Sequence, residues 1–112
     1  MKEMELINLI TNKLEEKLAE DIVLIDFTNQ GYVTDYFIIC TAKNYRHANS
    51  LVDFVEEEVL KNGHEIMQIN NERDSGWLVM DLNEVVVHIF SKNDRELYQL
   101  ERLWQDLPIT KM

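Results

Sequence analysis

Residues 35–41, Asp-Tyr-Phe-Ile-Ile-Cys-Thr, decide the fold because the five residues between Asp35 and Thr41 are apolar at consecutive positions and not only at every second one. A short run rich in β-branched and aromatic residues favours a strand. A strand without polar alternation is typical of the interior of a sheet that is covered on both faces. Residues 85–90, Val-Val-Val-His-Ile-Phe, have the same character. The two runs therefore predict an α/β fold in which helices cover both faces of a sheet.

The segments around these two strands alternate between helical and strand character. Apolar residues recur at helical spacing in residues 3–18, 45–62 and 92–104. Asn44 and Gly63 suit the N-cap and the C-terminal stop of the second helix. Leu97, Leu100 and Trp104 predict the core face of the third. Strands are predicted at residues 22–27, 35–41, 64–70, 77–81 and 84–90. This order predicts a mixed five-stranded sheet in one domain that spans residues 1–112.

The charge and the composition limit the classes of function. The chain has 112 residues, and its 21 acidic residues outnumber its 11 basic ones, for a net charge of −10. Such a surface disfavours direct nucleic-acid and lipid binding and favours a basic partner, although acidity also serves simply to keep a small protein in solution. No apolar run approaches the roughly 18–20 residues of a membrane span. The single cysteine, Cys40, fits a cytoplasmic protein without disulfides.

The sequence contains no recognisable catalytic constellation. The phosphate-binding patterns GxxxxGK[ST] and GxGxxG are absent, and His47, His64 and His88 do not have the spacing of metal ligands. Cys40 lies in mid-strand, where an inert buried thiol is expected. The sequence therefore predicts neither an enzyme nor a metal or cofactor site. His47, in the first turn of a helix, either reaches an anion or carboxylate or is an ordinary surface residue.

Large amphipathic side chains in the second half of the chain are candidates for a protein interface. Trp77, Met80 and Tyr98 are of the types favoured at interface centres, and Trp77 and Tyr98 lie off the predicted core positions. Trp104 is in helical phase with Leu100, which favours the core.

The order of these motifs resembles the ribosomal silencing factor family (RsfS, or Iojap-like). The resemblance runs from the first helix to Trp104 and is carried by Asp26, residues 35–39, Arg46-His47, residues 77–81 and 86–90, Arg95 and residues 98–104. Ala42, Asn44 and Tyr45 stand where the family usually has a glycine followed by serines, and Asn71 stands where it usually has a glycine. These departures concern the shape of loops.

The resemblance implies a function. Family members bind the large ribosomal subunit through ribosomal protein L14 and sterically block association with the small subunit, which represses translation under nutrient limitation. It also implies a fold related to nucleotidyltransferases, although the Gly-Ser and Asp-x-Asp elements of that chemistry are absent here. A homodimer of the free protein is a further expectation. A nucleotidyltransferase-like or metal-dependent enzyme, and an acidic adaptor for another basic partner, remain as alternatives.

Two groups of residues are therefore singled out. The predicted partner-binding residues are Trp77, Met80, Asp81, Tyr98 and Glu101. The predicted structural residues are Asp26, Asp35, His47, His88, Arg95 and Trp104.

Overall fold

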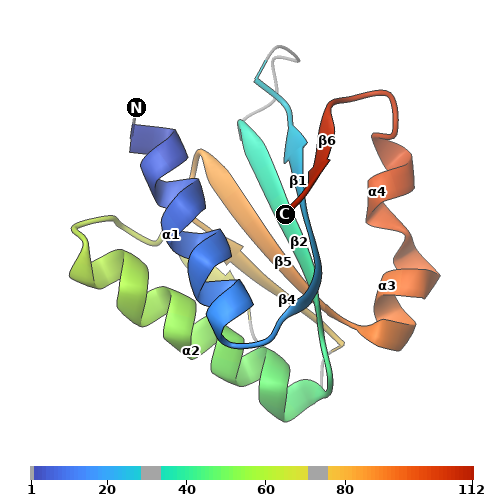
Figure 1. Ribbon diagram of the computed structural model, residues 1–112, viewed down its shortest axis with the longest axis horizontal. Helices are drawn as coiled ribbons and strands as arrows, with labels where there is room; N and C mark the ends of the chain where they lie inside the picture. Colours follow the sequence, from blue (N-terminus) through green and yellow to red (C-terminus); the bar gives the residue numbers. More distant parts are fainter. Residues whose placement is uncertain (1, 29–33, 71–75) are drawn as a thin grey trace.

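The computed structural model describes residues 2–28, 34–70 and 76–112. Its elements are α1 (Lys2–Glu16), β1 (Glu20–Asp26), β2 (Tyr36–Ala42), α2 (Tyr45–Lys61), β3 (Gln68–Asn70), β4 (Trp77–Asp81), β5 (Val85–Ser91), α3 (Lys92–Tyr98), α4 (Leu100–Leu103) and β6 (Ile109–Lys111). The strands that the structure describes form one six-stranded sheet in the order β3-β4-β5-β2-β1-β6 (Figure 1). β2 and β5 are parallel and the other pairs are antiparallel, so the predicted mixed α/β architecture is confirmed.

The two apolar runs of the sequence form the centre of this sheet. β2 pairs with β5 from Tyr36↔Val85 to Ala42↔Ser91, and both strands have a further strand on their other side. Ile38 and Ile39 point to opposite faces and are both fully buried. The prediction that residues 35–41 lie inside the sheet is therefore confirmed.

One face of the sheet, called here the closed face, is covered by α1 and α2, which lie side by side across it (Figure 1). The closed face is almost entirely aliphatic, because α1 contributes Ile7, Ile10 and Leu14 and α2 contributes a stripe that includes Leu51 and Val55. Each of these five side chains is fully buried. Both helices therefore have the amphipathic pattern that the sequence predicts.

The ends of α2 also match the sequence prediction. The Asn44 side chain accepts a hydrogen bond from the backbone N–H of His47 at 2.8 Å and caps the helix. Gly63 has φ of +83°, and the backbone N–H groups of Gly63 and His64 donate to the carbonyls of Leu60 and Val59. These two bonds form the Schellman motif, which needs a left-handed residue after the helix.

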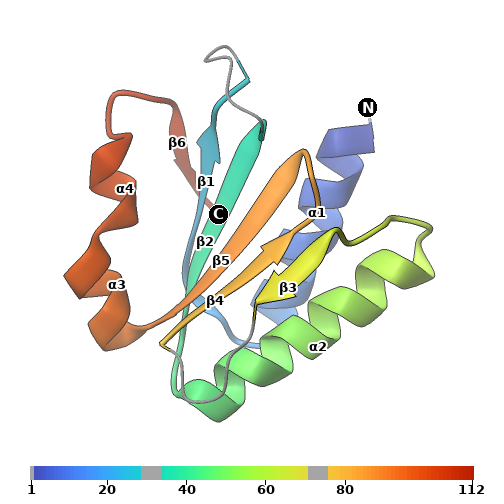
Figure 2. The same cartoon turned by 180° about the vertical axis from the view of Figure 1, so that it is seen from behind.

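The opposite face of the sheet is aromatic and only partly covered. Leu100 of α4 is buried there, and Trp104 packs against Phe27 and Phe37. In Figure 2, α3 and α4 stand beside β6 and β1, while no helix passes in front of β4 and β5. We call this side the half-open face.

The last helical segment differs from its prediction. The sequence predicts one helix over residues 92–104, but the chain forms α3 and α4 with a break at Gln99, which has left-handed φ and ψ of 46° and 49°. The break changes the direction of the segment, so Leu97 is 74% exposed while Leu100 is buried. The prediction that Leu97 is a core residue is therefore wrong.

The C-terminal strand and the third strand also correct the sequence analysis. β6 pairs with β1, which makes the predicted count of five strands wrong. β3 begins at Gln68, four residues later than predicted. Asn71, one of the departures from the family pattern, lies outside the described residues. Among the described residues, no helix is long and apolar enough to cross a membrane.

Candidate partner-binding surface

Trp77 is the first residue of β4 and lies on the half-open face. Its ring stacks on Phe90, the cross-strand partner in β5, with 5.0 Å between ring centroids and 27° between ring planes. Tyr98, at the end of α3, contacts the same indole at 4.9 Å. The indole Nε1–H donates a hydrogen bond to Nδ1 of His88 at 3.0 Å. Trp77 is therefore held by rings and by a directional bond, yet it stays only half-buried.

Tyr98 is presented by the helix break. It is the last residue of α3, and the left-handed Gln99 stops the helix directly after it. Tyr98 is 49% exposed although it contacts both Trp77 and Phe90. One side of its ring packs and the rest is available to a partner.

Within the described residues, the less covered part of the half-open face runs along β4 and the start of β5. Alternation along β4 puts Val79 and Asp81 on the same face as Trp77, and all three are half-buried. Val86 lies opposite Asp81 in the β4–β5 ladder and is also half-buried. We define the open surface by its five members: Trp77, Val79, Asp81, Val86 and Tyr98.

Asp81 also has a local structural role. Its Oδ1 accepts a hydrogen bond from the backbone N–H of Asn83 at 2.9 Å, which closes the turn between β4 and β5. Asn83 has positive φ, as turns of this kind require. The predicted contact of Asp81 with a partner stays a prediction.

Met80 corrects the predicted partner-binding set. Its side chain points to the closed face between Ile69 and Val87, its cross-strand neighbours, and is 0% exposed. A side chain in that position cannot reach a partner without opening the core. The prediction for Met80 is therefore wrong, because alternation along a strand puts it on the face opposite to Trp77.

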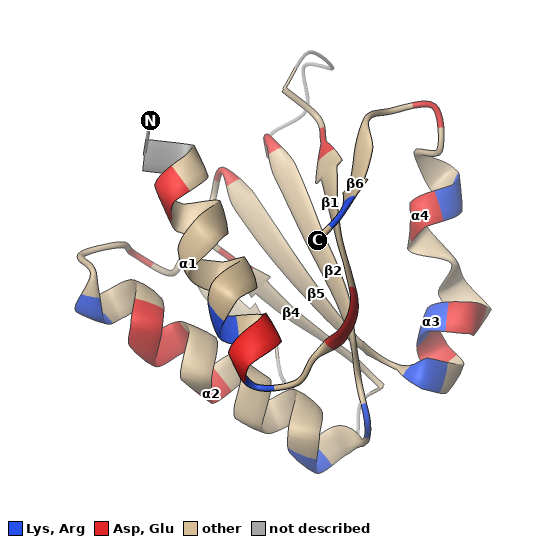
Figure 3. Ribbon diagram, viewed as in Figure 1, with Lys and Arg blue, Asp and Glu red and all other residues tan. Residues whose placement is uncertain are grey.

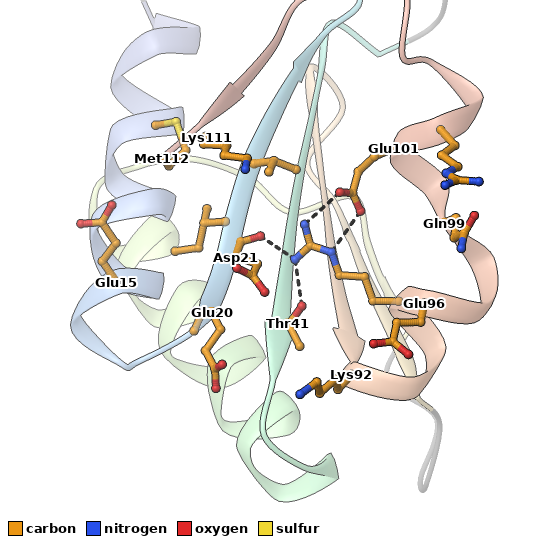
Figure 4. Close-up of a pocket in the computed structure, with 15 residues that line it drawn as sticks. Glu15, Glu20, Asp21, Thr41, Lys92, Glu96, Gln99, Glu101, Lys111 and Met112 are labelled. Atoms are coloured by element: carbon orange, nitrogen blue, oxygen red, sulfur yellow. Dashed lines mark hydrogen bonds and ion pairs between the residues drawn. The ribbon is translucent and has the colours of Figure 1, made fainter.

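Glu101 is held by an internal ion pair. Arg95 Nε donates to Glu101 Oε1 at 3.0 Å, and Nη2 donates to Oε2 at 3.2 Å. Arg95 Nη1 also donates to the carbonyl of Asp21 and to Thr41 Oγ1, so one guanidinium joins α3, α4, β2 and the start of β1 (Figure 4). Both carboxylate oxygens of Glu101 are used in this network. Its contact with a partner stays a prediction, but its first role is to hold α4 in place.

The Arg95 network lies in a hollow of about 690 Å³. Basic residues, Lys92, Arg102 and Lys111, line it together with acidic ones such as Glu20 and Glu96 (Figure 4). The mixture of charges gives the hollow no preference for a cation or an anion. Most of the hydrogen-bonding capacity of the guanidinium is already satisfied within the protein.

The remaining predicted structural residues have local partners. Asp26 accepts hydrogen bonds from the backbone N–H and the hydroxyl of Thr28, at 2.8 and 2.6 Å. The backbone carbonyl of Asp35 accepts from the N–H of Phe27, which ties the ends of β1 and β2. His47 Nδ1 accepts from the N–H of Lys43, so its Nε2–H donates to the carbonyl of Lys17 at 2.8 Å. His47 therefore links the α1–β1 loop to α2.

No nucleophile or metal site emerges from the described part of the chain. Burial raises the pKa of the Cys40 thiol to about 12, so this fully buried thiol stays protonated at neutral pH. Among the residues that the structure describes, no group of three or more His, Cys, Asp or Glu side chains could hold a metal ion.

The sequence predicts no bond between Trp77 and His88. A signal was available, because a hairpin with its link at residues 82–84 pairs Trp77 with Phe90 and Val79 with His88. Residues 77 and 88 are then diagonal neighbours on one face, within reach of long side chains.

The fold and the open surface define a small mixed α/β protein with one aliphatic, closed sheet face and one aromatic, partly open face. The family model described as "Ribosomal silencing factor during starvation" matches residues 1–112. The chain therefore belongs to the ribosomal silencing factor family.

Individual relatives agree with this assignment. "Ribosomal silencing factor RsfS" of Bacillus subtilis is 29% identical over 112 residues, which is all of this chain and 95% of that protein. A crystal structure of a protein from Bacillus halodurans has a TM-score of 0.82 and 29% identity, and the match covers 97% of this chain and 99% of that one. A mouse protein, "Mitochondrial assembly of ribosomal large subunit protein 1", is 29% identical over 101 residues, which is 88% of this chain and 44% of that protein.

Proposed function

We propose that this protein binds the large ribosomal subunit through ribosomal protein L14 and sterically blocks association with the small subunit. It thereby represses translation under nutrient limitation in the cytoplasm. The observation that carries the proposal is the open surface, where Trp77 and Tyr98 are held in place but remain accessible. Membership of the family and the large-subunit wording in the name of the mouse relative support the large ribosomal subunit as the partner.

The open surface has the composition of an interface centre. Trp77 and Tyr98 belong to the residue types that dominate binding hot spots, and Val79 and Val86 add apolar area beside them. Packing against Phe90 reduces the freedom that the two aromatic rings would lose on binding. Such a surface can bind a folded protein without rearrangement of the core.

The charge of the protein supports a basic partner. Acidic segments lie on all four helices and at several strand ends (Figure 3), and the net charge is −10. This spread of charge acts as a field over the molecule that repels phosphate and attracts a basic protein. The carboxylate of Asp81 puts one negative group directly on the open surface. We therefore expect contact with ribosomal protein and not with naked ribosomal RNA.

Sedimentation of purified ribosomal subunits with the protein tests the proposal. The wild-type protein is expected to travel with the large subunit and to reduce the fraction of joined ribosomes, and both effects should weaken as salt rises. Tyr98→Ala is expected to weaken both effects. The matched control is Leu60→Ala, because Leu60 is 51% exposed on α2, on the other side of the sheet. Equal binding of the wild-type protein to protein-free ribosomal RNA would contradict the proposal.

The same preparation separates the alternative functions. Turnover of a nucleotide with Mg²⁺ would support an enzyme with the nucleotidyltransferase kinship that the family resemblance implies. Binding to other basic proteins without any effect on subunit joining would support an adaptor. Sedimentation of the free protein at twice its monomer mass would support the homodimer.

A further inference from the structure

His88 is a polar side chain in aromatic surroundings. It lies on the half-open face of β5 and is 6% exposed. Phe37 is 4.5 Å from it between ring centroids, and Phe90 and Trp77 are at 6.3 and 5.8 Å. A phenylalanine would suit these neighbours as a packing residue.

The hydrogen bond from Trp77 fixes the protonation of this ring. Because the indole N–H can only donate, His88 Nδ1 must accept, and the proton of the neutral imidazole is on Nε2. Nε2 is buried and has no hydrogen-bond partner among the described residues. Burial also lowers the pKa of His88 to about 4, so the acceptor at Nδ1 is available at neutral pH.

This arrangement has a cost in folding free energy. A buried donor without a partner loses its bonds to water and gains nothing in return. Phenylalanine at the same position would remove this donor, although the indole N–H of Trp77 would then lose its acceptor. The histidine is therefore better explained by the one bond that it makes than by packing.

The bond to Trp77 controls the orientation of the indole. Stacking on Phe90 and contact with Tyr98 restrain the plane of the ring but do not specify which edge of it faces inward. The sp³–sp² torsion of an aromatic side chain is broad, so a half-buried indole can turn unless a directional bond holds it. The acceptor at His88 directs the Nε1 edge towards β5 and leaves the exposed part of the indole for the partner.

We propose that His88 is a positioning residue, which fixes the indole of Trp77 for partner binding through the bond from Nε1 to Nδ1. This inference rests on the proposed function for the identity of the partner. It explains why a polar ring, whose Nε2–H has no partner among the described residues, lies in an aromatic cluster. It also predicts that stability and affinity respond differently when His88 is replaced.

Two variants separate orientation from packing. His88→Phe keeps a planar ring and removes both the acceptor and the unpaired donor. It is expected to be as stable as the wild-type protein or more stable, and to bind large subunits about tenfold more weakly, which is about 1.4 kcal/mol. His88→Asn keeps an acceptor at the position of Nδ1 but is smaller. It is expected to melt earlier and to keep most of the affinity per folded molecule.

Solvent exchange of the indole N–H gives a readout in the free protein. We expect slow exchange at Trp77 Nε1 in the wild-type protein and in His88→Asn, and faster exchange in His88→Phe. Trp77→Phe identifies the resonance against that of Trp104. Exchange that is unchanged in His88→Phe, or affinity that follows stability in both variants, would overturn the proposal. A His88→Phe chain that fails to fold would overturn it as well, because the polar atoms of the imidazole would then be needed for stability.

The two proposals fail in different ways. If the wild-type protein does not bind large subunits, the proposed function is wrong, while indole exchange still decides whether His88 positions Trp77. If the wild-type protein binds and His88→Phe binds equally well, the proposed function stands and the role of His88 is wrong.

Discussion

The closed and half-open faces of the sheet are built from different side chains. The closed face is aliphatic, lies under two long helices, and has residues such as Ile10 and Leu51 at 0% exposure. The half-open face holds Phe27, Phe37, Trp77 and Trp104, and among the described residues it is covered by the short α3–α4 segment and by Leu107 in the link to β6. Aliphatic packing suits a core because it has no polar atoms to satisfy. Aromatic rings with polar edges suit a surface that is half covered and half in contact with a partner.

The contrast separates two tasks within one sheet. Burial of apolar area on the closed face supplies most of the stability, at roughly 25 cal/mol per Å². The half-open face gives up part of that burial and keeps Trp77 and Tyr98 accessible. Substitutions on the closed face should therefore change folding, and substitutions on the open surface should change binding.

The largest effect is expected from Leu51→Ala on the closed face. Leu51 is fully buried between α2 and the sheet, so its truncation leaves a cavity and should cost about 2–5 kcal/mol of unfolding free energy. Chemical denaturation measures this cost. Binding to large subunits per folded molecule should not change. A weaker affinity at full folding would show that the closed face also takes part in binding.

Trp77→Ala tests the other face. We expect a loss of about 2–4 kcal/mol in binding, or roughly thirty- to thousand-fold in affinity. Folding should also weaken, because the ring stacks on Phe90. Trp104→Ala is the matched control, since this half-buried indole packs against Phe27 and Phe37 on the covered part of the same face. Cosedimentation per folded molecule should fall for Trp77→Ala and not for Trp104→Ala. The opposite result would show that Trp104 binds the partner and that Trp77 is a packing residue.

The burial of His88 should make the stability of the protein depend on pH. Burial lowers its pKa from 6.5 to about 4 in the folded protein, and its ring neighbours Phe37, Trp77 and Phe90 carry no charge. Between these two pH values the unfolded chain binds a proton that the folded chain does not. His88 therefore has no such effect on stability above about pH 6.5. As the pH falls from 6.5 towards 4, its protonation in the unfolded chain lowers the unfolding free energy by up to about 3 kcal/mol.

Carboxylates also titrate in this range, so the test is a comparison of two proteins. Denaturation midpoints of the wild-type protein and His88→Phe are measured from pH 7 to pH 4. The wild-type protein should lose more stability than the variant over this window. Parallel curves would mean that the folded protein accommodates a protonated His88.

The closed face could be predicted from the sequence, and much of the half-open face could not. The helical period of α1 and α2 gives their buried stripes directly, and the unbroken apolar runs give the central strands. The helix break at Gln99 has no such signal, because its neighbours Leu97 and Leu100 continue a helical period across it. Helix propensity favours one continuous helix there, whereas the hydrogen bonds of Arg95 to Glu101 and Thr41 stabilise two short helices.

Only part of the partner-binding site could be predicted from the sequence. Trp77 and Tyr98 are indicated by their residue types alone, so their prediction does not depend on knowing that the helix breaks at Gln99. The residue type of Met80 suggests an interface, but alternation along β4 puts its side chain on the closed face. β6 was missed because a three-residue edge strand depends on backbone pairing with β1 more than on its own side chains, all of which are exposed.

The smallest expected effect lies at the end of α2, beside the closed face. Gly63 has φ of +83°, a conformation that costs an L-amino acid roughly 1 kcal/mol, and an added Cβ would meet no atom within 4 Å. Gly63→Ala should therefore lower the unfolding free energy by about 1 kcal/mol through backbone strain alone. Gly63→Asn should cost less, because asparagine tolerates left-handed geometry. Thermal melts rank the three proteins, and cosedimentation with large subunits should be equal for all of them. If Gly63→Ala weakened binding at full folding, the end of α2 would belong to the binding surface, and the division between a stabilising face and a binding face would be wrong.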